Sequence, residues 1–313
     1  MKNNKFLAYF TLVFAGIGIS QVFNYSTESE SDGSLKQSFN EDYKVYALPV
    51  PEKLVFADEN IPLQIDDVKE KLDRELLVNT YWQSNMLLYI KRAHKYFPVI
   101  EPILKEQGIP DDFKYLALIE SGLTNVVSPS GATGFWQITE STGKEYGLEI
   151  NSEVDERYHL EKATMAATKY LNEAYERYGD WTLAAGSYNM GMNGMDRQLE
   201  RQKVSSYFDL LLNTETGRYV YRILAVKEIM ADPSAYGFQV RQKDWWTMLP
   251  TESMEIDTAV KDLAQFSIDH GINYKVLKQY NPWLRKGQLS NSSGKSYQFE
   301  MPLKTNRVKL LSE

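Results

Sequence analysis

Residues 113–120 have the sequence Phe-Lys-Tyr-Leu-Ala-Leu-Ile-Glu, and this stretch is the centre of the predicted fold. It follows Pro110, a residue favoured in the first turn of a helix, and stops before Gly122, a residue that commonly ends one. With 3.6 residues per turn, the apolar side of the predicted helix carries Glu120 together with Phe113, Leu116 and Ala117. A carboxyl group on such a side is partly removed from water, which favours its protonated form and raises its pKa.

An acid that keeps its proton near neutral pH can protonate the leaving oxygen when a glycosidic bond is cleaved. A glutamate at a helix end beside serine and glycine is also typical of a solvated terminus. The interpretation of Glu120 therefore depends on the segments that follow it.

The composition predicts an ordinary globular protein. The 313 residues are 25% charged and 43% hydrophobic, with a net charge of −7. This charge and the lack of a basic run argue against a nucleic-acid partner. The chain has no cysteine and three scattered histidines, which excludes a thiol nucleophile and argues against a zinc site. We expect a monomer with no metal ion and no cofactor.

The first residues predict export. Lys2 and Lys5 precede an apolar run over residues 6–19, and polar, acidic sequence follows. Small residues at 18–20 offer a cleavage site. We therefore predict that residues 1–23 are a signal peptide and that the protein acts in the periplasm or cell envelope. The apolar run is almost long enough to span a bilayer, so an uncleaved N-terminal membrane anchor stays open.

The remaining chain divides into three parts. Residues 24–66 are rich in Ser, Glu, Asp and Pro, which predicts an extended linker. In residues 67–235 apolar side chains recur at helical spacing, which predicts a mostly α domain. In residues 236–313 two short helical patterns lie between alternating stretches, which predicts a small β-α-α-β module.

Three short segments of the α part carry the residues of a candidate site. The first is Glu120-Ser121-Gly122, the second is Gly-Phe-Trp-Gln at 134–137, and the third is Ser-Tyr-Asn at 187–189. Each is weak by itself, because glycine-rich loops and Ser-Tyr-Asn triplets occur by chance. Their order and spacing together are specific.

In these segments the chain resembles the lytic transglycosylases with an SLT domain, and most of all their membrane-bound lytic transglycosylase D branch. The resemblance covers roughly residues 80–235, with Phe135 and Ser187 departing from the usual Leu and Ala. It implies a lysozyme-like α fold. It also implies cleavage of the β-1,4 bond between N-acetylmuramic acid and N-acetylglucosamine in peptidoglycan glycan strands.

The resemblance also implies roles for single residues. Glu120 would be the catalytic acid/base, followed by the family's Ser121. Gln137 would contact the sugar and Trp136 would line the groove. Tyr188 would hydrogen-bond the catalytic carboxyl, and Asn189 would bind glycan.

The chemistry that the resemblance implies needs only one acid. A hydrolysing glycosidase normally uses two carboxylates, whereas the matched motifs hold Glu120 alone. The muramic C6 hydroxyl would attack C1 and leave a 1,6-anhydro end without using water. We interpret Glu140, Glu145 and Asp155 as surface and salt-bridge residues. A hydrolysing muramidase and a non-catalytic peptidoglycan-binding protein stay open as alternatives.

Residues 236–313 resemble a degenerate LysM peptidoglycan-binding module. The likeness rests on Leu-Lys-Gln-Tyr-Asn-Pro at 277–282 and on the last stretch before Pro302. The Gly-Asp-Thr-Leu turn of that family is reduced to Asp257-Thr258. Glycan binding and a purely structural role both stay open for this module.

Overall fold

The computed structural model describes residues 33–34, 36–37 and 45–303. The predicted signal peptide, residues 1–23, lies outside them. All the elements below belong to the unit Ala47–Glu313. Across the described ranges, none of the helices has both the length and the apolar character that crossing a bilayer requires.

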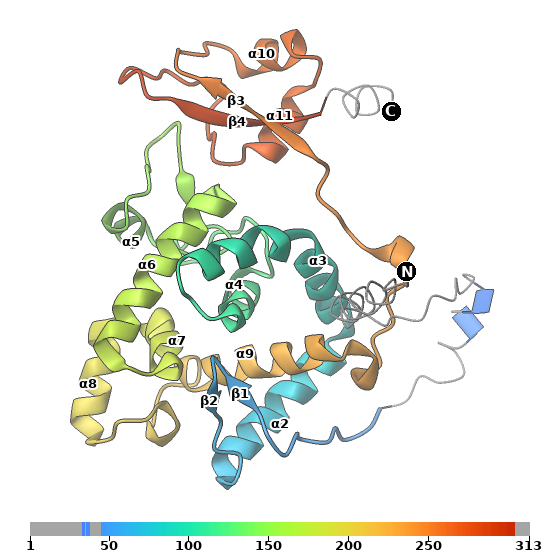
Figure 1. Ribbon diagram of the computed structural model, residues 1–313, viewed down its shortest axis with the longest axis vertical. Helices are drawn as coiled ribbons and strands as arrows, with labels where there is room; N and C mark the ends of the chain where they lie inside the picture. Colours follow the sequence, from blue (N-terminus) through green and yellow to red (C-terminus); the bar gives the residue numbers. More distant parts are fainter. Residues whose placement is uncertain (1–32, 35, 38–44, 304–313) are drawn as a thin grey trace, which may run out of the picture. The chain divides into compact units, whose positions relative to one another are not determined.

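Helices make up most of the chain from residue 66 to residue 231 (Figure 1). They are α2 (Asp66–Tyr81), α3 (Gln83–Glu106), α4 (Lys114–Ser121), α5 (Glu140–Glu145), α6 (Leu160–Tyr178), α7 (Trp181–Met190), α8 (Met192–Gln202) and α9 (Thr216–Ala231). The prediction of a mostly α domain is confirmed.

Local sequence explains where several helices begin and end. Gly122 and Gly179 follow α4 and α6 with φ of 60° and 62°, a left-handed backbone that glycine adopts without strain. The side chain of Asp180 accepts a hydrogen bond from the backbone N–H of Leu183 and so caps the start of α7. The long helical pattern after residue 66 is two helices, which meet at Trp82.

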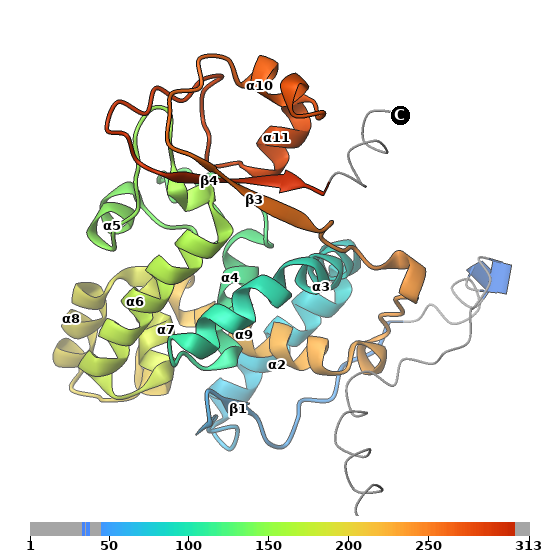
Figure 2. The same ribbon diagram turned by 45° about the horizontal axis from the view of Figure 1, so that its top comes forward.

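Helix α4 lies among the other helices of the domain (Figures 1 and 2) and packs against α3 and α9. On its apolar side Leu116 and Ala117 are fully buried, as predicted, and so is Phe113 in the 3-10 turn just before it. Because this side is close-packed, the end of α4 that carries Glu120 is held firmly against α9.

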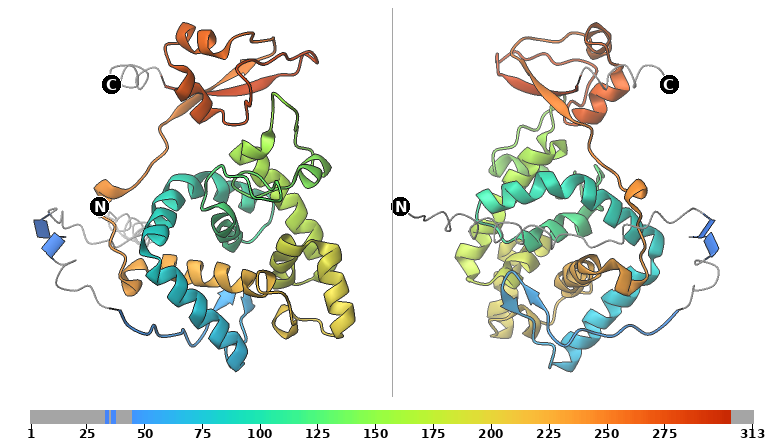
Figure 3. Two further views of the ribbon diagram at one scale, coloured as in Figure 1. Left: turned by 180° about the vertical axis from the view of Figure 1, so that it is seen from behind. Right: turned by 45° about the vertical axis from the view of Figure 1, so that its right-hand side comes forward.

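Residues 54–63 are part of the folded domain, so the predicted linker over 24–66 is wrong for this stretch. Strands β1 (Val55–Phe56) and β2 (Glu59–Asn60) form an antiparallel hairpin (Figure 3). The buried residues here are Leu54, Phe56, Ala57, Ile61 and Leu63. The Glu59 carboxylate accepts hydrogen bonds from the first two backbone N–H groups of α7. Proline and acidic residues between the apolar ones concealed this hairpin in the sequence.

The C-terminal module has the predicted β-α-α-β order (Figure 2). Its elements are β3 (Thr251–Ile256), α10 (Leu263–Asp269), α11 (Tyr274–Tyr280) and β4 (Tyr297–Pro302). The strands pair antiparallel with Ile256 opposite Tyr297, and α11 packs against β4. Phe238 and Val240 pack in the core of the helical domain, so that domain continues past the predicted boundary at residue 235.

Candidate active site

Glu120 lies in the last turn of α4, and its Oε1 atom accepts a hydrogen bond from the hydroxyl of Tyr219 on α9. Its side chain keeps partial access to solvent. Desolvation by the surrounding protein is the main cause that raises the pKa of Glu120 to about 7. The hydrogen bond from Tyr219 and the charge of Arg222 act in the opposite direction, and the charge of Glu215 adds to the rise. The predicted desolvation of Glu120 is confirmed.

The residues that act on Glu120 come from α9 and from its N-cap residue, Glu215. Glu215, Tyr219 and Arg222 are separated by four and three residues, the spacing of one helical face. Arg222 donates to the carbonyl oxygen of Ile119 at 2.9 Å. We did not identify this face from the sequence. The spacing of these three residues is its signal in the sequence, but other polar residues of α9, such as Arg218 and Lys227, obscure it.

Helix α9 is itself fixed by an ion pair between a partly exposed arginine and a buried glutamate. Arg218 donates to both carboxylate oxygens of Glu75 on α2, at 2.7 and 3.1 Å. Glu75 is almost completely buried. A bidentate pair between two helices restricts their rotation, so it keeps Tyr219 turned toward α4.

Residues 131–138 form a tight loop next to α4. Thr133 and Ile138 exchange two backbone hydrogen bonds, at 3.0 and 3.1 Å. Gln137 has a left-handed backbone, with φ of 49°. Its Nε2 atom donates to the carbonyl oxygens of Gly134 and Val126, at 2.8 and 3.1 Å. The partly exposed side chain of Gln137 therefore rests on its own loop.

Two hydroxyl groups hold the middle of this loop. Ser121 Oγ donates to the carbonyl oxygen of Phe135 at 2.8 Å, and the hydroxyl of Tyr188 donates to that of Trp136 at 2.8 Å. The expected hydrogen bond from Tyr188 to the catalytic carboxyl is therefore wrong. Helix α7 turns Tyr188 toward the loop, and α9 supplies the phenol that reaches Glu120.

Trp136 is completely buried. Its indole Nε1 donates to Thr164 Oγ1 at 2.8 Å, so its only polar group is paired inside the core. The expectation that Trp136 lines a groove is wrong. A large ring that can pair its single donor internally is more stable in the core than in water.

Asn189 connects the end of α7 to the start of α9. Its Oδ1 accepts a hydrogen bond from Thr216 Oγ1 at 2.7 Å, and its Nδ2 donates to Glu215 Oε1 at 3.4 Å. The side chain remains partly exposed. Through these contacts the structure brings all three sequence segments together around Glu120. The side chain of Trp136, however, points into the core.

Two of the other acidic residues near the motifs, Glu140 and Asp155, have ion-pair partners. Glu140 pairs with Lys144 at 2.5 Å on the surface, and Asp155 pairs with Arg157 at 2.7 Å in the interior. Burial lowers the pKa of His159 to about 4. Among the described residues, no group of three or more acidic or histidine side chains could hold a metal ion.

Two parts of the chain match known families. Residues 97–210 match the transglycosylase SLT domain, and residues 252–305 match the soluble lytic transglycosylase C-terminal LysM-like domain. The membrane-bound lytic murein transglycosylase D of Escherichia coli strain K12 is 27% identical over 238 residues, which cover 74% of this chain and 51% of that protein. The protein of the same name from E. coli O6:H1 gives the same values. This chain thus spans about half the length of the curated relatives it matches.

A solved structure of an inactive mutant of the lytic transglycosylase Slt from Pseudomonas aeruginosa is 18% identical to this chain. That likeness covers 48% of this chain and 26% of the other, with a TM-score of 0.38. The two family matches are consistent with the helical domain and the β-α-α-β module seen here. The chain carries a transglycosylase SLT domain followed by a LysM-like C-terminal domain.

Proposed function

We propose that this protein is a peptidoglycan lytic transglycosylase. It would cleave the β-1,4 bond between N-acetylmuramic acid and N-acetylglucosamine and leave a 1,6-anhydromuramic acid end. The observation that carries this proposal is the Glu120 carboxyl, whose pKa is raised to about 7 and which a buried tyrosine orients. Near neutral pH such a group exists in both forms, so it can donate a proton and later accept one. The match to the SLT domain supports the same reaction class.

In the proposed reaction Glu120 gives its proton to the bridging glycosidic oxygen, and the bond from C1 to that oxygen breaks. The oxygen leaves as a hydroxyl of N-acetylglucosamine. The C6 hydroxyl of the muramic residue then bonds to C1 and passes its proton to the Glu120 carboxylate. One bond breaks, one forms, no water is consumed, and Glu120 ends protonated as it began.

We assign supporting roles from the contacts of each side chain. Gln137 and Asn189 are partly exposed amides and would hydrogen-bond the sugars. Ser121 and Tyr188 would act indirectly, because their hydroxyls hold the loop that carries Gln137. Tyr219 would keep the catalytic carboxyl in one orientation.

Hydrolysis by a muramidase is the second candidate, and Glu215 is the observation that favours it. This exposed carboxylate lies close enough to Glu120 for its charge to raise the pKa of Glu120. A second carboxylate could activate a water molecule, as the general base of an inverting glycosidase does. The two reactions give different products, because hydrolysis leaves a reducing end that is one water heavier.

We also infer that the protein acts in the cell envelope on peptidoglycan strands. The lysines and the apolar run over residues 6–19 are typical of an export signal, with a membrane anchor as the alternative. The E. coli relative is described as membrane-bound.

The test is product analysis on purified peptidoglycan sacculi. We expect the wild-type protein to release anhydro-muropeptides and Glu120→Gln to lose roughly 10²–10⁴-fold in rate while keeping its fold. Glu140→Gln is the matched control, because Glu140 is an exposed glutamate with a surface ion pair to Lys144, and it should retain wild-type activity. Wild-type rates from Glu120→Gln would refute the role of Glu120. Heavier, reducing products would make the protein a muramidase, and intact sacculi would leave only a binding protein.

A further inference from the structure

We propose that Arg157 is a positioning residue for the loop of residues 131–138, an inference that rests on the proposed function. Its guanidinium group, fixed by Asp155, holds both ends of this loop and so presents Gln137 to the glycan. Arg157 itself does not touch the reacting atoms.

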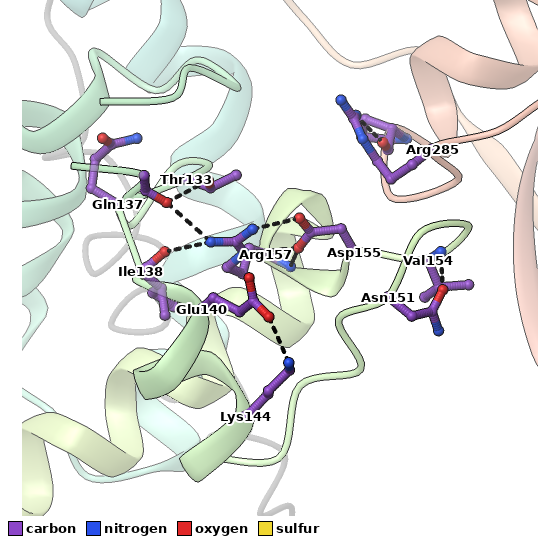
Figure 4. A network of polar contacts seen from close by, with 12 residues as sticks. Thr133, Gln137, Ile138, Glu140, Lys144, Asn151, Val154, Asp155, Arg157 and Arg285 are labelled. Atoms are coloured by element: carbon purple, nitrogen blue, oxygen red, sulfur yellow. Dashed lines mark hydrogen bonds and ion pairs between the residues drawn. The ribbon is translucent and has the colours of Figure 1, made fainter. Parts of the chain in front are cut away.

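The side chain of Arg157 lies between Asp155 and the loop (Figure 4). Its Nε and Nη2 atoms donate to the two carboxylate oxygens of Asp155, at 2.9 and 2.7 Å. Its Nη1 atom donates to the carbonyl oxygens of Gly131 and Ile138, at 3.1 and 3.4 Å. Both members of the ion pair are buried. One buried cation therefore connects the first and last residues of the loop.

These bonds complete the support of the loop. Ser121 and Tyr188 hold the carbonyl groups of Phe135 and Trp136, in the middle of the loop. Arg157 holds the two ends. The loop is thus held from α4, from α7 and from the segment before α6, which is the reason that a partly exposed stretch can keep one conformation.

The loop needs this support because its backbone is not relaxed. Gln137 has a positive φ of 49°, a region that a residue other than glycine enters at a cost. Gly134, with φ of 82°, packs so closely on the backbone of Arg157 that an added Cβ would lie 2.0 Å from the Arg157 carbonyl oxygen. Both the backbone and the side chain of Arg157 therefore shape the turn that ends at Gln137.

Asp155 is anchored on its other side by the C-terminal module. Its backbone N–H donates to the carbonyl oxygen of Trp283 at 2.9 Å. The neighbouring residue Val154 is buried with Trp283 and Leu284 in one apolar cluster. The carboxylate that orients Arg157 is thereby held from two directions.

Arginine suits this place better than lysine. Its planar fork binds a carboxylate through two parallel hydrogen bonds and still has donors for two carbonyl groups. Lysine keeps the positive charge, but its three N–H donors share one nitrogen atom and cannot form two parallel hydrogen bonds to a carboxylate. Arg157→Lys therefore separates geometry from charge.

The experiment is a double-mutant cycle with Arg157→Lys, Gln137→Ala and the combined variant, assayed on sacculi. We expect Arg157→Lys to lower kcat/KM about tenfold, mainly through a higher KM, with an unchanged pH profile because Glu120 is untouched. If Arg157 acts through Gln137, the kcat/KM of the combined variant is no lower than that of Gln137→Ala alone. The matched control is Arg177→Lys, which alters another Arg–Asp pair, with Asp196 of α8, and should keep wild-type kinetics.

Hydrogen exchange supplies a readout that does not depend on turnover. In Arg157→Lys the backbone amides of Thr133, Gly134 and Ile138 should exchange faster, whereas those of α6 should not. If Arg157→Lys does not fold, Asp155→Asn replaces it, because this change keeps the size of the side chain and weakens the same ion pair. We expect from Asp155→Asn the same rise in KM and the same local exchange.

Any of three results would overturn the proposal: losses of kcat/KM that add in the combined variant, a wild-type KM in the folded variants, or unchanged hydrogen exchange in the loop. Each of these results would leave the proposed function intact. A wild-type protein that releases no fragments from sacculi would overturn the proposed function, and the proposal with it.

Discussion

The hydroxyl of Tyr219 donates a hydrogen bond to Oε1 of Glu120, although 99 residues separate the two in sequence. Tyr219 is buried, and burial together with the charge of Glu120 raises its pKa well above the ordinary value. The phenol therefore stays a donor throughout the working pH range. Its hydrogen bond favours the ionised carboxylate, while desolvation favours the acid, and the pKa of about 7 reflects the balance.

Tyr219→Phe should shift the pH dependence of catalysis. Without the hydrogen bond that stabilises the carboxylate, the pKa of Glu120 rises further, so the upper limb of the kcat/KM profile moves to higher pH. The maximum rate should fall about tenfold, or about 1.4 kcal/mol, because the carboxyl loses its orientation. Tyr221→Phe, two residues along α9, is the control. An upper limb that stays in place would show that Tyr219 does not set this pKa.

Tyr188→Phe should act differently from Tyr219→Phe. The lost bond is the one to the carbonyl oxygen of Trp136, so we expect the free energy of unfolding to fall by about 1 kcal/mol. The rate should fall with a changed KM and with no shift of the pH profile. Denaturant unfolding and a pH series on sacculi measure both effects, and a shifted profile would contradict this assignment.

The raised pKa of Glu120 should also appear in stability. The folded state holds this proton up to about pH 7, whereas the unfolded state releases it near the ordinary pKa of 4.5. The stability present below pH 4.5 is therefore lost as pH rises through 7, by up to about 3 kcal/mol. Glu120→Gln has no titrating carboxyl at this position, so it does not lose this stability as the pH rises. Urea unfolding should find the variant and the wild type similar at acidic pH, and the variant more stable at about pH 8.

The stability gap at pH 8 has a clear control. Glu140→Gln removes an exposed glutamate and should show no such gain at high pH. Parallel stability curves for Glu120→Gln and wild type would mean that the Glu120 carboxyl is as solvated in the folded state as in the unfolded chain.

Trp136→Phe should cost stability without weakening glycan binding. The change leaves Thr164 Oγ1 without the indole donor and creates a small cavity, for a loss of about 1–3 kcal/mol. Because Trp136 is fully buried, KM for sacculi should stay within about twofold of wild type. Gln137→Ala is the comparison, since it should raise KM with little effect on stability. A large rise in KM for a stable Trp136→Phe would favour a sugar-binding role.

Much of the fold could be predicted because its signals are local. The apolar side of α4, its end at Gly122 and the end of α6 at Gly179 depend on residues within one or two turns. The β-α-α-β order of the C-terminal module follows from short periodic stretches in the same way.

The errors in the prediction concern contacts between distant segments. The hairpin of β1 and β2 is too short to show periodicity, and its buried residues join the core of the helical domain, where Phe56 packs against Phe113. The two tyrosines near the site both present a phenol, and only the packing of their helices decides which one reaches Glu120.

The sequence by itself determined that an acid would lie on the apolar side of a short helix, because helical periodicity places Glu120 beside Leu116 and Ala117 whatever surrounds them. The tertiary structure alone decided which residue donates a hydrogen bond to Glu120, that Trp136 is buried, and that Arg157 holds the loop of residues 131–138. Hydrogen bonds act over about 3 Å, so the choice of partner depends on how helices from distant parts of the sequence pack.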